Sequence, residues 1–414
     1  MKRIKSSRII CPDGIISGYL YFEDGKIREI TASEISVDET IDVGDAWVSP
    51  GFIDTHTHGG GGNSFAGTTE EIVAGCNFHL RHGTTSICPT IAADRFEKMA
   101  EAAANVCAAA KHPELKSHII GSHMEGPYLS ASQAGAQPPA HITPPVRQDY
   151  LPFLEQYGRS VRRWTYAPEN DPEGVFADTL KHYGVVASAG HTDAIYPEMK
   201  NAMHHGCNLV THLYSCTSTV TRDHGFRRLG VIETAWLEED LYVEIIADGK
   251  HLPPELLRMI LKIKGSDRIL LCTDSMQVAG CDMTQGRLQD IEFIIEDGVC
   301  KLPDRSAFAG SIATADNLVR VMVQEAGVSI PQAVKMITEV PARVFGLTDR
   351  GALKPDLAAD IVVFDDDIRM KRVFVSGKET SDTSFGHPGQ TIIRGCLAKI
   401  FSIKVTIEQG CHSE

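Results

Sequence analysis

The first fifty residues alternate apolar and polar positions in short runs separated by turn-forming triplets. The triplets are Pro-Asp-Gly at 12–14, Glu-Asp-Gly at 23–25 and Val-Gly-Asp at 43–45. A period of two places apolar side chains on one face of a strand, and Gly with Asp favours tight turns between strands. Residues 1–50 are therefore predicted to form a small antiparallel β module.

The same alternation returns near the other end, in GALKPDLAADIVVFDDD at 351–367 and MKRVFVSGKE at 370–379. Between the two ends, short apolar runs alternate with helical patterns such as DRFEKMAEAAANVCAAAK at 94–111. This alternation is typical of repeated β/α units around a parallel sheet. The strand candidates are Gly51–His58, Thr84–Pro89, Ser117–Glu125, Arg163–Ala167, Val185–His191, Leu209–His212, Val243–Ala247 and Ile269–Asp274.

Eight such units favour a closed (β/α)₈ barrel of the TIM type over an open doubly wound sheet. The predicted fold is therefore α/β, with residues 51–350 forming the barrel. Residues 1–50 and 351–414 are expected to meet outside it as one discontinuous β-sandwich module, the second part ending in a C-terminal tail.

Composition and charge narrow the function. A length of 414 residues suits a large barrel with an accessory module, and a net charge of −14 with mixed signs argues against nucleic acid or an anionic membrane as partner. A small anionic substrate remains compatible. Eleven cysteines occur singly, without a Cys-x-x-Cys pair, which favours reduced thiols and a cytoplasmic location. No apolar run approaches the length of a membrane span.

The first barrel strand ends in GFIDTHTHGGGG at 51–62. His56 and His58 are two residues apart, so they point the same way if the segment is a strand. The glycines of 59–62 permit a sharp turn and are expected to leave space above the histidine pair, as an open metal position would need. A hairpin with two exposed histidines would give the same pattern, so the segment alone does not decide.

Other predicted strands also end in residues that bind metals or move protons, namely Glu125, His191, His212 and Asp274. A single buried histidine is commonly a core residue, and an Asp before a Ser is commonly a helix cap. Five such endings at the same end of a barrel indicate an active site. One carboxylate and two imidazoles would hold a divalent ion and leave a position for water or substrate. His56 and His58 would hold a second ion, bridged to the first through Glu125 or a shared hydroxide, with Asp274 nearby.

Eight motifs in order resemble the N-acetylglucosamine-6-phosphate deacetylase family of the amidohydrolase superfamily. They are PGFIDTHTHG, GSHMEGPYL, SAGHT, THLY, IADGKH, CTDS, FAGS and ADIVVF, between Pro50 and Phe364. The resemblance implies that Glu125, His191 and His212 are the metal ligands and Asp274 is the catalytic acid and base. It also implies that His251 contacts the substrate and that His56 and His58 match members with two ions; other members lack this pair and use one.

Two loops depart from the family pattern. Ser215 replaces an asparagine after the sixth strand, and Gln137, after Ala136, stands where a histidine is expected. The resemblance implies that both loops bind the sugar phosphate. The later loop would do so across the interface of a homodimer, through an arginine that aligns best with Arg227. Arg222 and Arg228 are the alternatives.

The expected activity is metal-dependent hydrolysis of the acetamide of an N-acetyl amino sugar 6-phosphate, foremost N-acetylglucosamine 6-phosphate. The ion is expected to be Zn²⁺, with Fe, Co or Mn as alternatives and one or two ions per subunit. A deacetylase for another hexosamine, a hydrolase of cyclic amides, an aminoacylase and a non-catalytic sugar-phosphate sensor are the other hypotheses. The tail after Glu379 matches no family motif; its apolar alternation suggests one more strand, and His387 and His412 have no evident partners.

Overall fold

The computed structural model describes residues 1–380, and these contain the predicted barrel. Eight strands lie in chain order around it, joined by parallel ladders. Between the last and the first strand, the Asp274 amide donates to the His56 carbonyl over 2.8 Å. The barrel strands are β6 (Phe52–Thr57), β9 (Thr84–Ala92), β11 (Ser122–Glu125), β12 (Val161–Tyr166), β13 (Val186–Ala189), β14 (Leu209–Val210), β17 (Tyr242–Ile245) and β18 (Ile269–Leu271).

All eight predicted strands are therefore confirmed, although their ends differ. The third candidate is divided at Gly121 into β10 (His118–Ile119) and β11, because Gly121 has a φ of 132°, outside the strand region. Only glycine fits here, since a Cβ would lie 2.8 Å from the Ser160 carbonyl oxygen. His191, His212 and Asp274 lie just beyond their strands, in the connecting loops that carry function in this fold.

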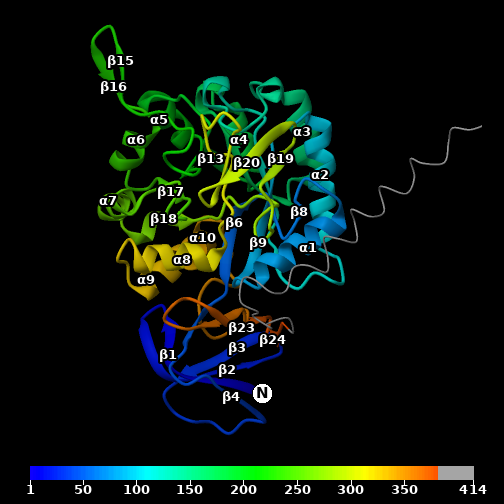
Figure 1. The fold of residues 1–414 in the computed structure, drawn as a ribbon, viewed down its shortest axis with the longest axis vertical. Coiled ribbons are helices and arrows are strands. Elements are labelled where there is room, and N and C mark those ends of the chain that lie inside the picture. The colour runs from blue at the N-terminus through cyan, green and yellow to red at the C-terminus, as the bar shows by residue number, and fades with distance from the viewer. Residues whose placement is uncertain (381–414) are drawn as a thin grey trace, which may run out of the picture.

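Helices cover the outside of the barrel (Figure 1). Local sequence explains several helix starts; the first helix has a capping box in which Thr68 and Glu71 bond each other's backbone amides. In the described part of the chain the helices are α1 (Thr69–Leu80), α2 (Phe96–Ala109), α3 (Arg147–Tyr157), α4 (Val175–His182), α5 (Tyr196–His204), α6 (Val231–Leu237), α7 (Pro254–Lys264), α8 (Ala315–Gln324), α9 (Ile330–Ile337) and α10 (Glu339–Val344).

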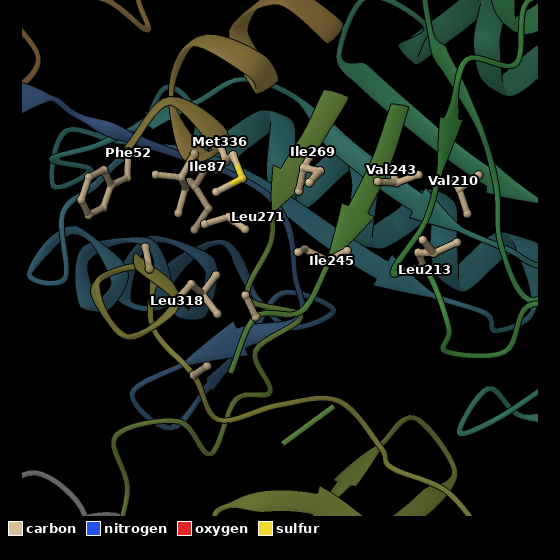
Figure 2. Packing of buried hydrophobic residues seen from close by; sticks show 14 of the residues in the cluster. Phe52, Ile87, Val210, Leu213, Val243, Ile245, Ile269, Leu271, Leu318 and Met336 are labelled. Carbon is tan, nitrogen blue, oxygen red and sulfur yellow. The ribbon is translucent and has the colours of Figure 1, made fainter. Parts of the chain in front are cut away.

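The main core lies between the strands and these helices. Figure 2 shows Ile269 and Leu271 of β18 with Leu318 of α8 and Met336 of α9, all completely buried. Burying one such side chain contributes about 1.5–3 kcal/mol. This apolar layer holds the strand ends in fixed positions, which the site requires.

The two terminal segments form one sheet outside the barrel, which confirms the discontinuous β module. Strand β5 joins them by pairing with β1 from the same segment and with β22 from the other. Figure 1 shows the module below the barrel, with blue and orange strands side by side. Its strands are β1 (Lys2–Cys11), β2 (Gly14–Glu23), β3 (Lys26–Thr31), β4 (Glu39–Asp42), β5 (Trp47–Pro50), β22 (Ile361–Phe364), β23 (Met370–Val375) and β24 (Lys378–Glu379).

Two insertions leave the barrel. A hairpin of β15 (Thr221–Asp223) and β16 (Phe226–Arg228) projects away from the rest of the molecule, and a three-stranded sheet separates β18 from α8 (Figure 1). The strands of that sheet are β19 (Gln285–Leu288), β20 (Ile291–Glu296) and β21 (Val299–Lys301). A short pair, β7 (Gly59–Gly60) and β8 (Asn63–Ser64), follows the first barrel strand.

The predictions for the tail, including its extra strand, His387 and His412, concern residues outside those described. Within residues 1–380, no helix has both the length and the apolar character needed to cross a membrane.

Candidate active site

The predicted strand-end residues meet in one buried cluster at the carboxyl end of the barrel. Each of the six side chains is at most 11% exposed. The cluster consists of His56, His58, Glu125, His191, His212 and Asp274. His191, His212 and Asp274 have φ angles of 47°, 27° and 46°, a left-handed conformation that costs non-glycine residues about 1–3 kcal/mol. Backbone strain of this kind concentrates at functional sites.

Glu125 lies at the centre of the cluster. Its Oε1 is 3.1 Å from His212 Nε2, 3.3 Å from His191 Nε2 and 3.2 Å from His56 Nε2. Its Oε2 is 3.2 Å from His58 Nε2. Four imidazole nitrogens therefore converge on one carboxylate.

These donors fit a divalent ion. The donor atoms of Glu125, His191 and His212 lie within 4.8 Å of one another, and so do those of His56, His58 and Glu125. Because imidazole and carboxylate donors suit zinc and related ions, either group can supply three ligands. The two groups share Glu125, as the sequence led us to expect for a bridging carboxylate.

The protonation states support the same interpretation. Burial lowers the pKa of His212, which keeps it in the neutral form that binds metals. Burial also lowers the pKa of His56, but the charges of Glu125 and Asp274 outweigh burial and raise that pKa to about 10. The carboxylates thus create a strongly negative field at the centre of the cluster, which a cation would neutralise.

Asp274 is next to the histidine pair. Its Oδ1 is 3.1 Å from His58 Nε2 and 3.4 Å from His56 Nε2. Burial raises the pKa of Asp274, but the two histidines outweigh burial and lower it below its ordinary value. The carboxylate is therefore ionised and able to accept a proton.

The glycine run 59–62 turns the chain as predicted, with Gly61 and Gly62 at φ angles of 61° and 86°. Its role in leaving space above the histidines stays a prediction, and His58 does line the cavity described below. A Cβ on Gly60 would lie 2.5 Å from the ring of Phe78 in α1, so the missing side chain makes room for this helix.

A cavity of about 270 Å³ opens from the cluster. His251 lines it and is held by Asp248, whose Oδ2 lies 2.8 Å from His251 Nδ1. The ring of Phe308 packs edge-on against His251 at 4.9 Å. Ala136 and Ser215, two of the predicted substrate-binding residues, also line the cavity.

Gln137 lines the cavity too, but both ends of its side chain already have protein partners. Its Nε2 donates to Glu125 Oε2 over 2.7 Å, and its Oε1 accepts from the Ala93 amide over 2.8 Å. The structure therefore places Gln137 on the central carboxylate, and its contact with substrate stays a prediction.

The three candidate arginines lie on the projecting hairpin, and none of them lines the cavity of its own chain. Arg222 and Arg227 are opposite each other in the β15–β16 ladder. Arg228 contacts Asp223 through a close ion pair. Within residues 1–380 of one chain, the structure thus does not bring Arg227 together with the metal cluster.

The sequence interpretation missed Glu244, whose Oε1 lies 3.0 Å from His56 Nδ1. It also missed the Gln133 carbonyl, which is 2.9 Å from His191 Nδ1. A backbone carbonyl leaves no signal in the sequence. Glu244 did leave one, because it is a charged residue within the apolar strand segment YVEII at 242–246.

Comparison with known proteins agrees with this geometry. The N-acetylgalactosamine-6-phosphate deacetylase of Shewanella sp. (strain ANA-3) is 33% identical over 79% of this chain and 82% of its own length. The N-acetylglucosamine-6-phosphate deacetylase of Lysinibacillus sphaericus is 29% identical over 87% of this chain and 92% of its own length.

Among solved structures, a mutant N-acetyl-D-glucosamine-6-phosphate deacetylase from Mycobacterium smegmatis, in complex with N-acetyl-D-glucosamine-6-phosphate, is similar. It has a TM-score of 0.85 and 27% identity, over 91% of this chain and 98% of that one. The N-acetylglucosamine-6-phosphate deacetylase of Thermotoga maritima has a TM-score of 0.82 and 27% identity, over 91% of this chain and 99% of that one. The model of the amidohydrolase family matches residues 47–395. Because this model covers most of the chain and the residues at the strand ends meet in one site, the chain belongs to the amidohydrolase family.

Proposed function

We propose that this protein hydrolyses the acetamide group of an N-acetyl amino sugar 6-phosphate and releases acetate. The observation that carries the proposal is the convergence of Glu125, His191 and His212 beside an ionised Asp274. Relatives of 33% and 29% identity, aligned over most of their own length, are deacetylases of such sugars, which supports the choice of substrate.

Glu125, His191 and His212 would hold one divalent ion, and His56 with His58 a second that shares Glu125. We propose Zn²⁺, because imidazoles and a carboxylate leaving one position open are its usual catalytic donors; Fe, Co and Mn are the alternatives. Bound there, such an ion supplies an acidified water molecule and a polarised amide carbonyl.

Asp274 is the proton carrier of the proposed reaction. Its carboxylate accepts a proton from the attacking water, and the protonated side chain then donates to the departing amine nitrogen. His251 faces the same cavity with Nε2, because Asp248 holds Nδ1. We assign to His251 the binding of the substrate's carbonyl oxygen, where negative charge develops.

The phosphate of the substrate would be bound by the loops that carry Ser215 and Arg227. Arg227 lies outside the cavity of its own chain, on a hairpin that projects from the molecule (Figure 1). We therefore propose a homodimer in which Arg227 reaches the cavity of the partner subunit. An arginine can bind phosphate with two parallel hydrogen bonds.

Two sugars compete as the preferred substrate. N-acetylglucosamine 6-phosphate is our first choice, whereas the 33% identity to an N-acetylgalactosamine-6-phosphate deacetylase favours the other epimer. Acetate release from both phosphates, and from the two sugars without phosphate, decides between them by kcat/KM. Release from none of the four would refute the proposed function, and equal kcat/KM with and without phosphate would refute the phosphate site.

A further inference from the structure

Beneath the metal cluster the barrel interior is polar, where a barrel of this type ordinarily packs branched apolar side chains. Seven of the eight barrel strands contribute polar side chains to this interior layer, from residues in the strand or directly after it. All these side chains belong to residues at most 1% exposed: Thr55, Thr90, His123, Arg163, Thr165, Ser188, Thr211 and Glu244.

Arg163 and Glu244 are the charged members of this layer and form an ion pair across the barrel interior. Arg163 Nη2 is 2.9 Å from Glu244 Oε1, and Nη1 contacts Oε2. The remaining guanidinium donors reach Thr211 Oγ1 at 2.8 Å and Ser188 Oγ at 3.1 Å. Both charges are thus compensated within the layer.

The Glu244 carboxylate has further contacts that point upward to the metal cluster. Its Oε1 is 3.0 Å from His56 Nδ1 and accepts from the His212 amide over 3.3 Å. A carboxylate paired with an arginine offers acceptor oxygens, so His56 Nδ1 donates to Glu244 Oε1.

The other nitrogen of His56, Nε2, is the one available to a metal ion. His56 Nε2 has no hydrogen-bond partner among the described residues, and it lies 3.2 Å from Glu125 Oε1 and 3.4 Å from Asp274 Oδ1. The ring of His123 packs edge-on against His56 at 4.5 Å. The imidazole is therefore held in one orientation, with Nδ1 towards Glu244.

A buried ion pair contributes little net stability, and replacing one by apolar residues of similar size is often neutral or stabilising. Stability is thus a weak explanation for Arg163 and Glu244. Their contacts with His56 give a better one, since the partners of a metal-binding histidine fix its tautomer and orientation.

We propose that Glu244, with its charge balanced by Arg163, is the positioning residue of the His56 half of the metal site. Glu244 fixes His56 so that Nε2 meets Glu125 and Asp274. This inference rests on the proposed metal site and is independent of which amide is hydrolysed. The other half, Glu125 with His191 and His212, contacts Glu244 only through the backbone amide of His212.

The test is a Zn²⁺ titration of the full chain in competition with a chromophoric chelator. We expect wild type to bind two equivalents and His56→Ala to lose one. Glu244→Gln should weaken that same equivalent about 10–100-fold, and the other less than threefold. Ser188→Ala alters the polar layer without touching Glu244 or His56, so it serves as the matched control and should bind both ions as wild type does.

Glu244→Gln leaves the buried charge of Arg163 uncompensated, which could unfold the protein. Two double variants that also remove this charge separate misfolding from loss of the His56 contact. Arg163→Met with Glu244→Leu removes both charges and the acceptor for His56, and should lose the His56 equivalent. Arg163→Met with Glu244→Gln restores an oxygen acceptor, and should recover part of the affinity. The absorption spectrum of bound Co²⁺ reports the ligand geometry of each variant.

Wild-type affinity for both ions in the Leu-containing double variant would overturn the proposal. So would a wild-type protein that binds a single ion unaffected by His56→Ala. A protein that binds both ions as expected but releases no acetate from any amino sugar would refute the proposed function and leave the role of Glu244 standing.

Discussion

At the residue scale, function is concentrated in side chains whose charge depends on their neighbours. Asp274 is buried, yet His56 and His58 keep it ionised. The proposed role of Asp274 as proton carrier requires this state, because a protonated carboxyl cannot accept the proton of an attacking water.

Asp274→Asn tests that role. We expect the variant to keep its metal and lose about 10²–10⁴-fold in kcat, since an amide cannot exchange the proton. His212→Ala is the contrasting variant and should lose the ion held with Glu125 and His191, and with it the activity. The measurements are metal content by elemental analysis and the rate of acetate release. Near wild-type turnover of Asp274→Asn would exclude Asp274 as the proton carrier.

At the element scale, the β15–β16 hairpin is the least integrated part of the barrel. It is a two-stranded sheet whose ladder joins it to no other strand of the described chain, and Phe226 near its tip is 77% exposed. Short isolated hairpins are marginally stable by themselves. A dimer interface would explain the exposed aromatic ring and the exposure of Arg227, whose hydrogen bond is to the Gly225 carbonyl of the same hairpin.

Arg227→Ala is expected to raise KM for the phosphorylated substrate and to leave the unphosphorylated sugar almost unaffected, because the lost contact is to phosphate. Arg228→Ala is the matched control on the same hairpin, where Asp223 already pairs with the arginine. Equal losses of kcat/KM for both substrates would show that Arg227 supports the fold or the dimer instead.

Dimers that combine two different variant chains show whether Arg227 acts in its own subunit or in the partner subunit. If Arg227 acts on the partner subunit, combining Arg227→Ala with Asp274→Asn chains gives dimers with one complete cavity and a restored KM. If it acts within its own subunit, mixing restores nothing, since each chain then carries its own defect.

At the scale of the whole molecule, the β module is fastened to the bottom of the barrel by a buried charge network. Arg350 Nη1 donates to Ser86 Oγ of β9 over 3.0 Å and to Asp360 Oδ2 over 3.3 Å. Asp360 also accepts from the Ser376 amide over 2.8 Å and has a side chain only 4% exposed.

Arg350→Ala should therefore lower the free energy of unfolding by about 1–3 kcal/mol, because it removes the arginine partner of the buried Asp360 carboxylate and leaves His118, 3.3 Å from Oδ1, beside it. Urea unfolding of the metal-loaded protein measures this. Arg369→Ala, which removes an exposed pair with Asp367, should change stability little. Equal urea midpoints of unfolding for wild type and Arg350→Ala would show that the buried Asp360 carboxylate does not need Arg350.

The sequence by itself determined the barrel, the β module and the identity of the strand-end residues. Strand and turn propensities are local, and in a (β/α)₈ barrel every strand ends at the same face, so Glu125, His191, His212 and Asp274 could be grouped before any distance was known. The spacing of His56 and His58 within one strand indicated the histidine pair, and the family motifs added His251.

Only the tertiary structure decided how these residues are supported. Glu244 meets His56, and Gln137 meets Glu125, across distances that arise when the sheet closes on itself. The space freed by the glycine run goes to Phe78, and Arg227 lies outside the cavity of its own chain. Contacts between residues far apart in the chain depend on closure and packing, which periodicity along one strand does not encode.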